Sequence, residues 1–274
     1  MKKKKVTPVT ILFYMFNIFF ALVILVPIVY CFNVSMMEMK EMFSGSFWPH
    51  QLMLDNYKRA IELAPFFTFI KNSLIVAVVT TLAQVVTGAM AAYAFSMMEF
   101  KGKNILFMLM LATMMIPGQA IIIANYLTIA NWGLRDTFAA LILPHAATAF
   151  AVFNMRQAFL QFPKELKEAA DIDGCTNFKF FYKIAIPLIK PSLGALGIYV
   201  FLQSWNQYLW PLLVTDTVDM RTVQIGLGML QGAESTDFRP VMAGSMIILI
   251  PSIIAFVAGQ KQLISGLTSG AVKG

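Results

Sequence analysis

Six long apolar runs divide this chain, and they constrain its fold more than any other feature. The runs are residues 11–32, 70–95, 105–127, 138–159, 193–214 and 241–260. A helix needs about 20 mostly apolar residues to cross the hydrocarbon core of a bilayer, and each run has roughly that length. The sequence therefore predicts an all-α integral membrane protein, with six transmembrane helices forming one domain over residues 11–260.

The composition supports a lipid environment. Hydrophobic residues make up 58% of the 274 residues and charged residues only 13%, whereas a soluble domain carries about 25% charged residues. The net charge of +7 does not indicate nucleic acid as a partner, because the basic residues lie between the apolar runs, where they act as topology signals.

Four prolines and the basic N-terminus bear on whether each apolar run is a continuous, retained helix. Pro27, Pro117, Pro144 and Pro251 lie inside apolar runs, where neighbouring helices can satisfy the backbone groups that a proline frees, so we expect kinks and not helix ends. The basic N-terminus, residues 1–10, is compatible with a signal peptide. The run at 11–32 is too long for a typical signal core and lacks a small-residue cleavage site, so a retained first helix is the prediction.

The distribution of basic residues predicts the orientation. With the N-terminus in the cytoplasm, fourteen of the 21 Lys and Arg residues fall inside and seven outside, as the positive-inside rule requires. Both termini are then cytoplasmic, including the tail at 261–274, and so is the segment 161–191; residues 33–69, 128–137 and 215–240 lie outside. Cys31 falls within a membrane run and Cys175 in the cytoplasm, so no disulfide is expected.

Chemical groups that would drive transport or catalysis are missing from the runs. They contain no Asp or Glu, although ion-coupled carriers usually need an ion site within the membrane. There is no GxxxxGK[ST] loop for ATP, and His50 and His145 are too isolated for a metal site; we expect His145 to be packed and neutral. These absences predict no catalytic residue and no bound cofactor, so another subunit must supply the energy. An independent carrier or channel remains the alternative.

The segment 161–191 carries the strongest signal. Pro163 suits the first turn of a helix, and Asp173-Gly174 indicates a turn with a left-handed backbone, so the segment is predicted to form a cytoplasmic helix–turn–helix between the fourth and fifth spans. Four aromatic residues cluster in its second half, at Phe178, Phe180, Phe181 and Tyr182. Such a cluster indicates an interaction surface, or else burial against lipid headgroups.

Within this segment, Glu168-Ala169-Ala170, then Gly174, then Ile184-Ala185-Ile186-Pro187 resembles the EAA loop of ABC-importer membrane subunits. Only Ile186 departs from the pattern, standing where leucine is usual. In that family the loop docks into a groove of the ATPase subunit. The resemblance implies an ATPase-coupling role for Glu168, Ala169, Ala170, Asp173, Gly174, Phe178, Phe181, Ile184 and Pro187.

Shorter patches extend the resemblance over most of the chain. They include Asn72-Ser73-Leu74, Asp136-Thr137, Trp205-Asn206 and the C-terminal Gly270-Ala271-Val272-Lys273-Gly274, and their order is similar to the carbohydrate (maltose-type) group of permeases. The resemblance implies a bacterial plasma-membrane protein with a second permease, an ATPase pair that binds ATP and Mg²⁺, and an extracytoplasmic solute-binding protein. The implied solute is a sugar or oligosaccharide, with glycerol phosphate or another polar solute as the alternative.

Polar residues near the end of the fifth run indicate where a solute would pass. Amides inside a span should face the bundle or a water-filled path, and sugars bind to amides and flat aromatic rings. The predicted pathway residues are Gln203, Trp205, Asn206, Gln207 and Tyr208. An aromatic belt at the membrane surface is the alternative, and we favour it for the neighbouring Trp210.

Overall fold

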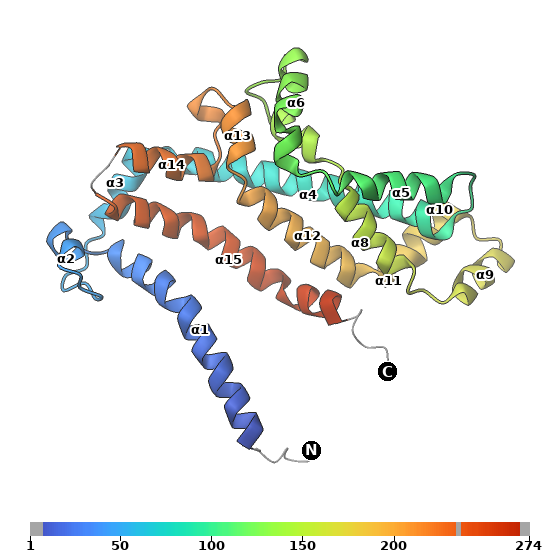
Figure 1. The fold of residues 1–274 in the computed structure, drawn as a ribbon, viewed down its shortest axis with the longest axis horizontal. Coiled ribbons are helices and arrows are strands. Elements are labelled where there is room, and N and C mark those ends of the chain that lie inside the picture. Colours follow the sequence, from blue (N-terminus) through green and yellow to red (C-terminus); the bar gives the residue numbers. More distant parts are fainter. Residues whose placement is uncertain (1–7, 234–236, 269–274) are drawn as a thin grey trace. The chain divides into compact units, whose positions relative to one another are not determined.

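A computed structural model describes residues 8–233 and 237–268 of the chain, which are helical and contain no strand (Figure 1). The chain forms two compact units. The first comprises Met1–Phe66 and Leu227–Leu249, and the second Phe67–Gly226 and Ile250–Gly274. The helices are α1 (Pro8–Val34), α2 (Met39–Phe43), α3 (Asp55–Leu63), α4 (Phe66–Met97), α5 (Lys103–Thr113), α6 (Gly118–Asn131), α7 (Phe138–Ile142), α8 (Ala149–Phe159), α9 (Lys164–Ile172), α10 (Asn177–Phe180), α11 (Ile186–Leu188), α12 (Lys190–Trp205), α13 (Leu209–Val214), α14 (Val223–Ala233) and α15 (Arg239–Thr268).

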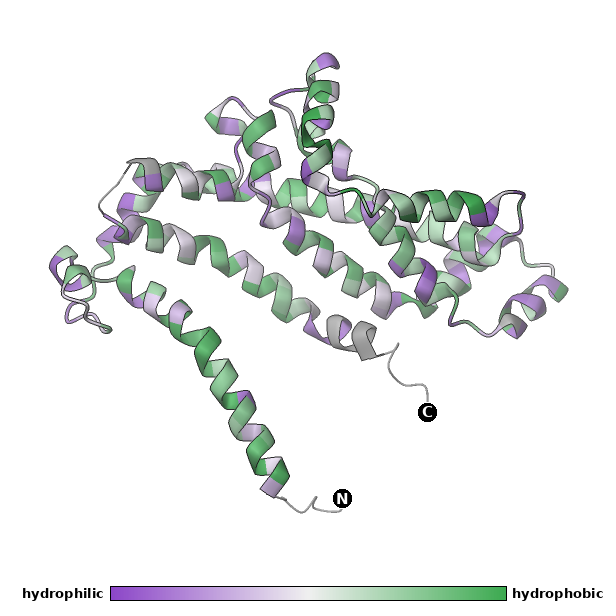
Figure 2. Cartoon of the chain, viewed as in Figure 1, coloured by the Kyte–Doolittle hydropathy of each residue, from purple (hydrophilic) through white to green (hydrophobic). Residues whose placement is uncertain are grey.

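Within the described residues, three helices are long and apolar enough to cross a membrane: α1, α4 and the Arg239–Gln262 part of α15. Three bent pairs pass the same criterion together, which gives up to six spans. The pairs are α5 with α6, bent by 96°, Phe138–His145 with α8, bent by 47°, and Asn177–Leu188 with α12, bent by 76°. Figure 2 shows the hydrophobic residues distributed along these helices. The architecture agrees with the predicted six-span membrane protein.

Three of the predicted runs are interrupted, which corrects the expectation of continuous, kinked helices. The third run breaks before Pro117, where α5 ends at Thr113 and α6 starts at Gly118. The fourth breaks after a short 3₁₀ turn, η1 (Leu143–His145), and the fifth breaks after Trp205. Proline lacks the N–H that would continue the helix, which accounts for the first two breaks. Pro27 and Pro251, by contrast, lie inside continuous helices.

Side chains of α4 and α8 satisfy the backbone at the break after η1. The Gln84 amide donates to the His145 carbonyl at 2.7 Å, and the Thr87 hydroxyl donates to the Ala146 carbonyl at 3.2 Å. Thr148 caps α8 by accepting from the Ala151 N–H at 3.3 Å. Irregular backbone at membrane depth requires such partners or water, so these three side chains make the break possible.

Close helix crossings hold the second unit together. Gly88 of α4 lies against α8, where an added Cβ would be 3.0 Å from the Cβ of Ala151. Gly259 of α15 leaves room for Ile198 of α12, whose Cδ1 would be only 1.7 Å from a Cβ at position 259. Small residues let membrane helices approach closely where hydrophobic driving force is weak. The two glycines therefore act as packing contacts.

The first unit contains α1 and a polar network around α3. Residues of α1 are exposed over most of its length, as expected of a helix surrounded by lipid. The buried Asn56 donates to the carbonyls of Ser35 and Met37, both at 3.0 Å. Asp237 is also buried and accepts hydrogen bonds from the Arg239 guanidinium. The first contacts fix the segment that follows α1, and the second fix the start of α15.

Candidate functional site

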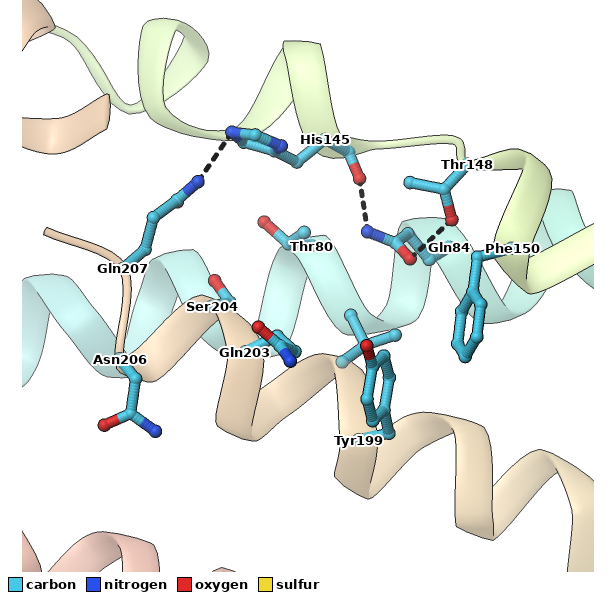
Figure 3. Close-up of a pocket in the computed structure, with 11 residues that line it drawn as sticks. Thr80, Gln84, His145, Thr148, Phe150, Tyr199, Gln203, Ser204, Asn206 and Gln207 are labelled. Atoms are coloured by element: carbon cyan, nitrogen blue, oxygen red, sulfur yellow. Dashed lines mark hydrogen bonds between the residues drawn. The ribbon is translucent and has the colours of Figure 1, made fainter. Parts of the chain in front are cut away.

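A polar cavity of about 370 Å³ lies in the second unit, where two helix breaks meet α4 (Figure 3). Side chains from α4, from the stretch between the end of η1 and the start of α8, and from the second half of α12 with the two residues after it surround it. The lining residues are Thr80, Gln84, His145, Thr148, Phe150, Tyr199, Val200, Gln203, Ser204, Asn206 and Gln207. Most of these side chains carry amide, hydroxyl or aromatic groups, and none is charged unless His145 is protonated.

The break after α12 places two amides differently. Asn206 caps the helix, with its amide donating to the Leu202 carbonyl at 2.8 Å, and its side-chain oxygen accepts from Gln224 at 3.2 Å. Gln207 turns to the opposite break, where its Nε2 lies 2.8 Å from Nε2 of His145. Figure 3 shows Gln207 reaching towards His145 while Asn206 points away from it.

A second set of hydrogen bonds fixes the other wall. Besides donating to the His145 carbonyl, Gln84 accepts from the Thr148 hydroxyl at 2.9 Å. Both the nitrogen and the oxygen of its amide are therefore hydrogen-bonded. Thr80 lies one helical turn before Gln84 and is only 2% exposed. Its hydroxyl makes no hydrogen bond to any described residue. Thr80 thus places one buried hydroxyl without a hydrogen-bond partner among the described residues in the cavity wall.

The predicted pathway residues divide into two groups. Gln203, Asn206 and Gln207 line the cavity. Trp205 and Tyr208 are outside the lining: Trp205 is 1% exposed and stacks on Phe201, whereas Tyr208 is 46% exposed. Trp210 was expected in an aromatic belt, but it is buried and its indole donates to the Ala140 carbonyl at 3.0 Å.

Sequence reasoning missed much of the wall. Thr80 and Gln84 are four residues apart and share one face of a mostly apolar helix, a signal that could have identified them. Tyr199 likewise precedes Gln203 by four residues. His145 was expected to be packed and structural, and it is both hydrogen-bonded and part of the cavity lining.

The predicted coupling segment folds as short helices joined by a tight turn. After α9, Gly174 has φ +70°, and the N–H groups of Cys175 and Gly174 donate to the carbonyls of Ala170 at 2.8 Å and Asp171 at 3.0 Å. This pair of bonds is a Schellman motif, whose left-handed position favours glycine. Asp173 is the last residue before that turn. The second half continues through α10, a π-helical turn η2 (Phe181–Ala185) and α11.

One side of this segment is anchored and the other is exposed. Ala170, Phe180 and Ala185 are buried, and the Tyr93 hydroxyl of α4 donates to the Asn177 carbonyl at 3.1 Å. The remaining side chains of the coupling set are partly or fully open to solvent. Glu168, Ala169, Asp173, Phe178 and Pro187 are exposed, while Phe181 and Ile184 are intermediate.

Exposed apolar groups cluster on the coupling segment. Ile172 is 86% and Phe178 74% exposed, and the Phe178 ring lies 5.3 Å from that of Tyr182. Exposed apolar side chains of this size indicate a contact surface. Residues 8–233 and 237–268 contain no group of three or more His, Cys, Asp or Glu side chains that could hold a metal ion.

Comparison with known proteins gives a consistent result. Residues 84–264 match the model of the family described as binding-protein-dependent transport system inner membrane component. The arabinooligosaccharides transport system permease protein AraQ of Halalkalibacterium halodurans is 35% identical over 280 residues, covering 99% of this chain and all of that protein. The protein of the same name from Bacillus subtilis is 37% identical over 82% of this chain and 81% of its own length.

Two further relatives extend the comparison. The sn-glycerol-3-phosphate transport system permease protein UgpE of Escherichia coli is 34% identical over 89% of this chain and 91% of its own length. A bacterial ABC transporter involved in the import of the acidic polysaccharide alginate has the same fold. It shows a TM-score of 0.79 and 24% identity over 95% of this chain and 98% of the other. From these matches, the chain belongs to the family of binding-protein-dependent ABC transport permeases, the non-catalytic inner membrane subunits of importers.

Proposed function

We propose that this permease forms half of the translocation pathway for a neutral sugar or oligosaccharide. A binding protein delivers the solute, and a separate ATPase pair, with its own ATP and Mg²⁺, drives its passage. The observation that carries the proposal is the polar cavity between two helix breaks. In secondary transporters, substrate sites are typically formed by discontinuous helices near the middle of the membrane, and helix breaks line this cavity in the same way.

The chemistry of the cavity suits an uncharged, hydroxyl-rich solute. Gln203 and Ser204 supply donors and acceptors, and the rings of Phe150 and Tyr199 lie 4.8 Å apart on its wall. No Lys or Arg is among the described residues that line it, although phosphate sites usually contain one. Glycerol phosphate, the solute named for the Escherichia coli relative, is therefore the second candidate. The second permease would line the rest of the path.

The exposed coupling segment supports an ATPase contact. Its apolar side chains, Ile172 and Phe178, would be buried in a groove of the partner, and Glu168 would lie beside them. In a bacterial plasma membrane, this segment and both termini then face the cytoplasm. The binding protein acts on the extracytoplasmic side. Closure of the ATPase pair would be transmitted through these helices to the cavity.

Transport in liposomes tests the proposal. The complex is purified in mild detergent with its ATPase and second permease, and its uptake of radiolabelled arabinooligosaccharides and of glycerol phosphate is measured with and without the binding protein. Neutral sugar uptake that requires ATP and the binding protein is expected. Replacing Asn206 by Leu should lower that uptake without releasing the ATPase. Uptake by the chain alone would instead indicate an independent carrier, and preference for glycerol phosphate would overturn the neutral substrate.

A further inference from the structure

A second cavity borders the turn that carries His145. Its volume is about 330 Å³, and it lies between α6 and η1 within the second unit. The lining residues are Asn125, Thr128, Ile129, Trp132, Leu143 and Pro144. Because Pro144 directly precedes His145, consecutive residues of one turn line this cavity and the polar cavity described above.

The α6 side of the second cavity is one face of a fixed helix. Asn125, Thr128, Ile129 and Trp132 have the spacing i, i+3, i+4 and i+7, which places them on a single face. Ile129 is 2% exposed and packs in an apolar cluster with Val76 and Leu141 of the same unit. This buried residue holds the face against the rest of the unit.

Another Schellman motif fixes the position of Trp132. Gly133 has φ +67°, and the N–H groups of Leu134 and Gly133 donate to the carbonyls of Ile129 at 3.1 Å and Ala130 at 3.0 Å. Trp132 is the residue immediately before this glycine, and its own N–H donates to the Thr128 carbonyl at 3.1 Å. The backbone that presents the indole ring is therefore rigid.

The side chains on this face are available for a ligand. Trp132 is 63% exposed. Among the described residues no hydrogen bond is made by the Asn125 amide, which is only partly exposed. The Thr128 hydroxyl donates to the Ala124 carbonyl at 2.9 Å, which leaves its oxygen free to accept. A flat ring beside an amide and a hydroxyl matches the apolar face and the hydroxyls of a sugar unit.

Resting on the proposed function, we propose that Trp132, Asn125 and Thr128 form a second saccharide subsite. One sugar unit stacks on the indole ring and hydrogen-bonds to Asn125, while another occupies the polar cavity on the other side of the turn. The permease consequently selects for oligosaccharides over shorter sugars.

The rival role for Trp132 is as an anchor in the aromatic belt of the membrane surface. The Asn125 amide argues against it. A polar side chain without a partner is costly when it faces lipid, whereas water or a sugar hydroxyl satisfies it in a hydrated path. The two roles also predict different effects on transport.

Uptake by the liposome complex is measured for arabinooligosaccharides from the disaccharide to the hexasaccharide. Trp132→Ala should raise KM about tenfold for the longer sugars, as loss of an aromatic anchor does, and leave the disaccharide unchanged. Asn125→Leu should act in the same direction. Trp48 provides the matched control, because it is also 63% exposed but lies outside the cavity; Trp48→Ala should affect no length selectively.

A second measurement does not depend on transport. Brominated lipids quench tryptophans that face the bilayer, so the difference in quenching between the unsubstituted protein and Trp132→Phe reports the surroundings of Trp132. A negligible difference is expected. Strong lipid quenching, or equal effects of Trp132→Ala on all lengths, would overturn the subsite while leaving sugar import intact. Absence of uptake for every saccharide would overturn the proposed function and the subsite with it.

Discussion

Gln207 and His145 join two interrupted helices, with their Nε2 atoms 2.8 Å apart. Neither helix continues through this point: α12 has ended at Trp205, and α8 has not yet begun. The contact therefore bridges two irregular segments on the wall of the polar cavity. Relative movement of these segments during transport must stretch or replace this bond.

We expect Gln207→Leu to lower uptake by about two- to tenfold, since a hydrogen bond of this kind contributes about 0.5–1.5 kcal/mol. His145→Phe should have a similar effect, and the double variant should be no worse than either single one, because the two residues share one interaction. Uptake rates of the three variants in liposomes, at equal ATPase content, provide the measurement. Additive losses would show that the two side chains act independently.

Gly174→Val should give a permease that inserts into the membrane but binds or couples its ATPase poorly. An added Cβ meets nothing within 4 Å, so the cost is backbone strain of about 1–2 kcal/mol, which displaces Phe178 without unfolding the protein. Copurification of the ATPase and sugar-stimulated ATP hydrolysis are the measurements.

Gly102 offers a control for this substitution, because it has φ +80° and open space around it but lies outside the coupling segment. Gly102→Val should retain coupling. Gly174→Asn should also retain much of it, since asparagine tolerates the left-handed region better than valine does. If Gly174→Val couples normally, the segment is a passive linker.

Cys175 should be labelled by a membrane-impermeant thiol reagent only after cells are permeabilised. This expectation follows from the predicted cytoplasmic position of the segment and from the partial exposure of the thiol. Cys31→Ser removes the background of the second cysteine. Labelling in intact cells would reverse the orientation.

Gly259→Ala should destabilise the protein, because the new Cβ would overlap with Ile198 and overpacking costs about 1–3 kcal/mol. Combining it with Ile198→Ala should recover part of the loss by making room. Thermal unfolding in detergent measures both, with Gly118→Ala as a control at a position with nothing within 4 Å. A normal transition temperature for Gly259→Ala would contradict the close crossing.

Acid should weaken the first unit through Asp237. The hydrogen bonds from Arg239 and the nearby charge of Arg59 hold the pKa of this carboxyl below its ordinary value, despite its burial. Because the pKa of Asp237 is lower in the folded protein, its carboxylate adds to the free energy of unfolding at pH values above the unfolded-state pKa of about 3.9. That stability is lost as pH falls through the lower pKa of the folded state. Asp237→Asn should lower the transition temperature at pH 7 and reduce its decline below about pH 4. An unchanged pH profile would remove Asp237 as the cause.

Hydropathy predicted where the long helices lie, because burial in lipid requires length and apolarity alone. The left-handed turn at Gly174 was also predictable, since it depends on the local sequence and glycine favours that backbone conformation. The break after Trp205 was not, because no proline lies at residues 206–208 and the interruption depends on partners such as Gln224 and His145, which are distant in sequence. Only tertiary contacts bring Thr80 and Gln84 to the same cavity as Gln203.

The predicted boundary of the C-terminal tail differs from the observed helix. The sequence predicts that the last span ends at Gln260, but α15 continues to Thr268, since Lys261 and Gln262 are good helix formers and hydropathy marks only where lipid contact ends. Residues 269–274 of the tail and residues 1–7 of the basic N-terminus lie outside the described residues.

The interrupted helices also give the polar cavity an electric character. The C-terminal end of α12 and the N-terminal end of α8 both border it. The macrodipole of a helix is equivalent to about half a negative charge at its C-terminus and half a positive charge at its N-terminus. An ion that is attracted to one end is repelled by the other. A neutral molecule whose hydroxyl groups both donate and accept can be oriented by the two ends together.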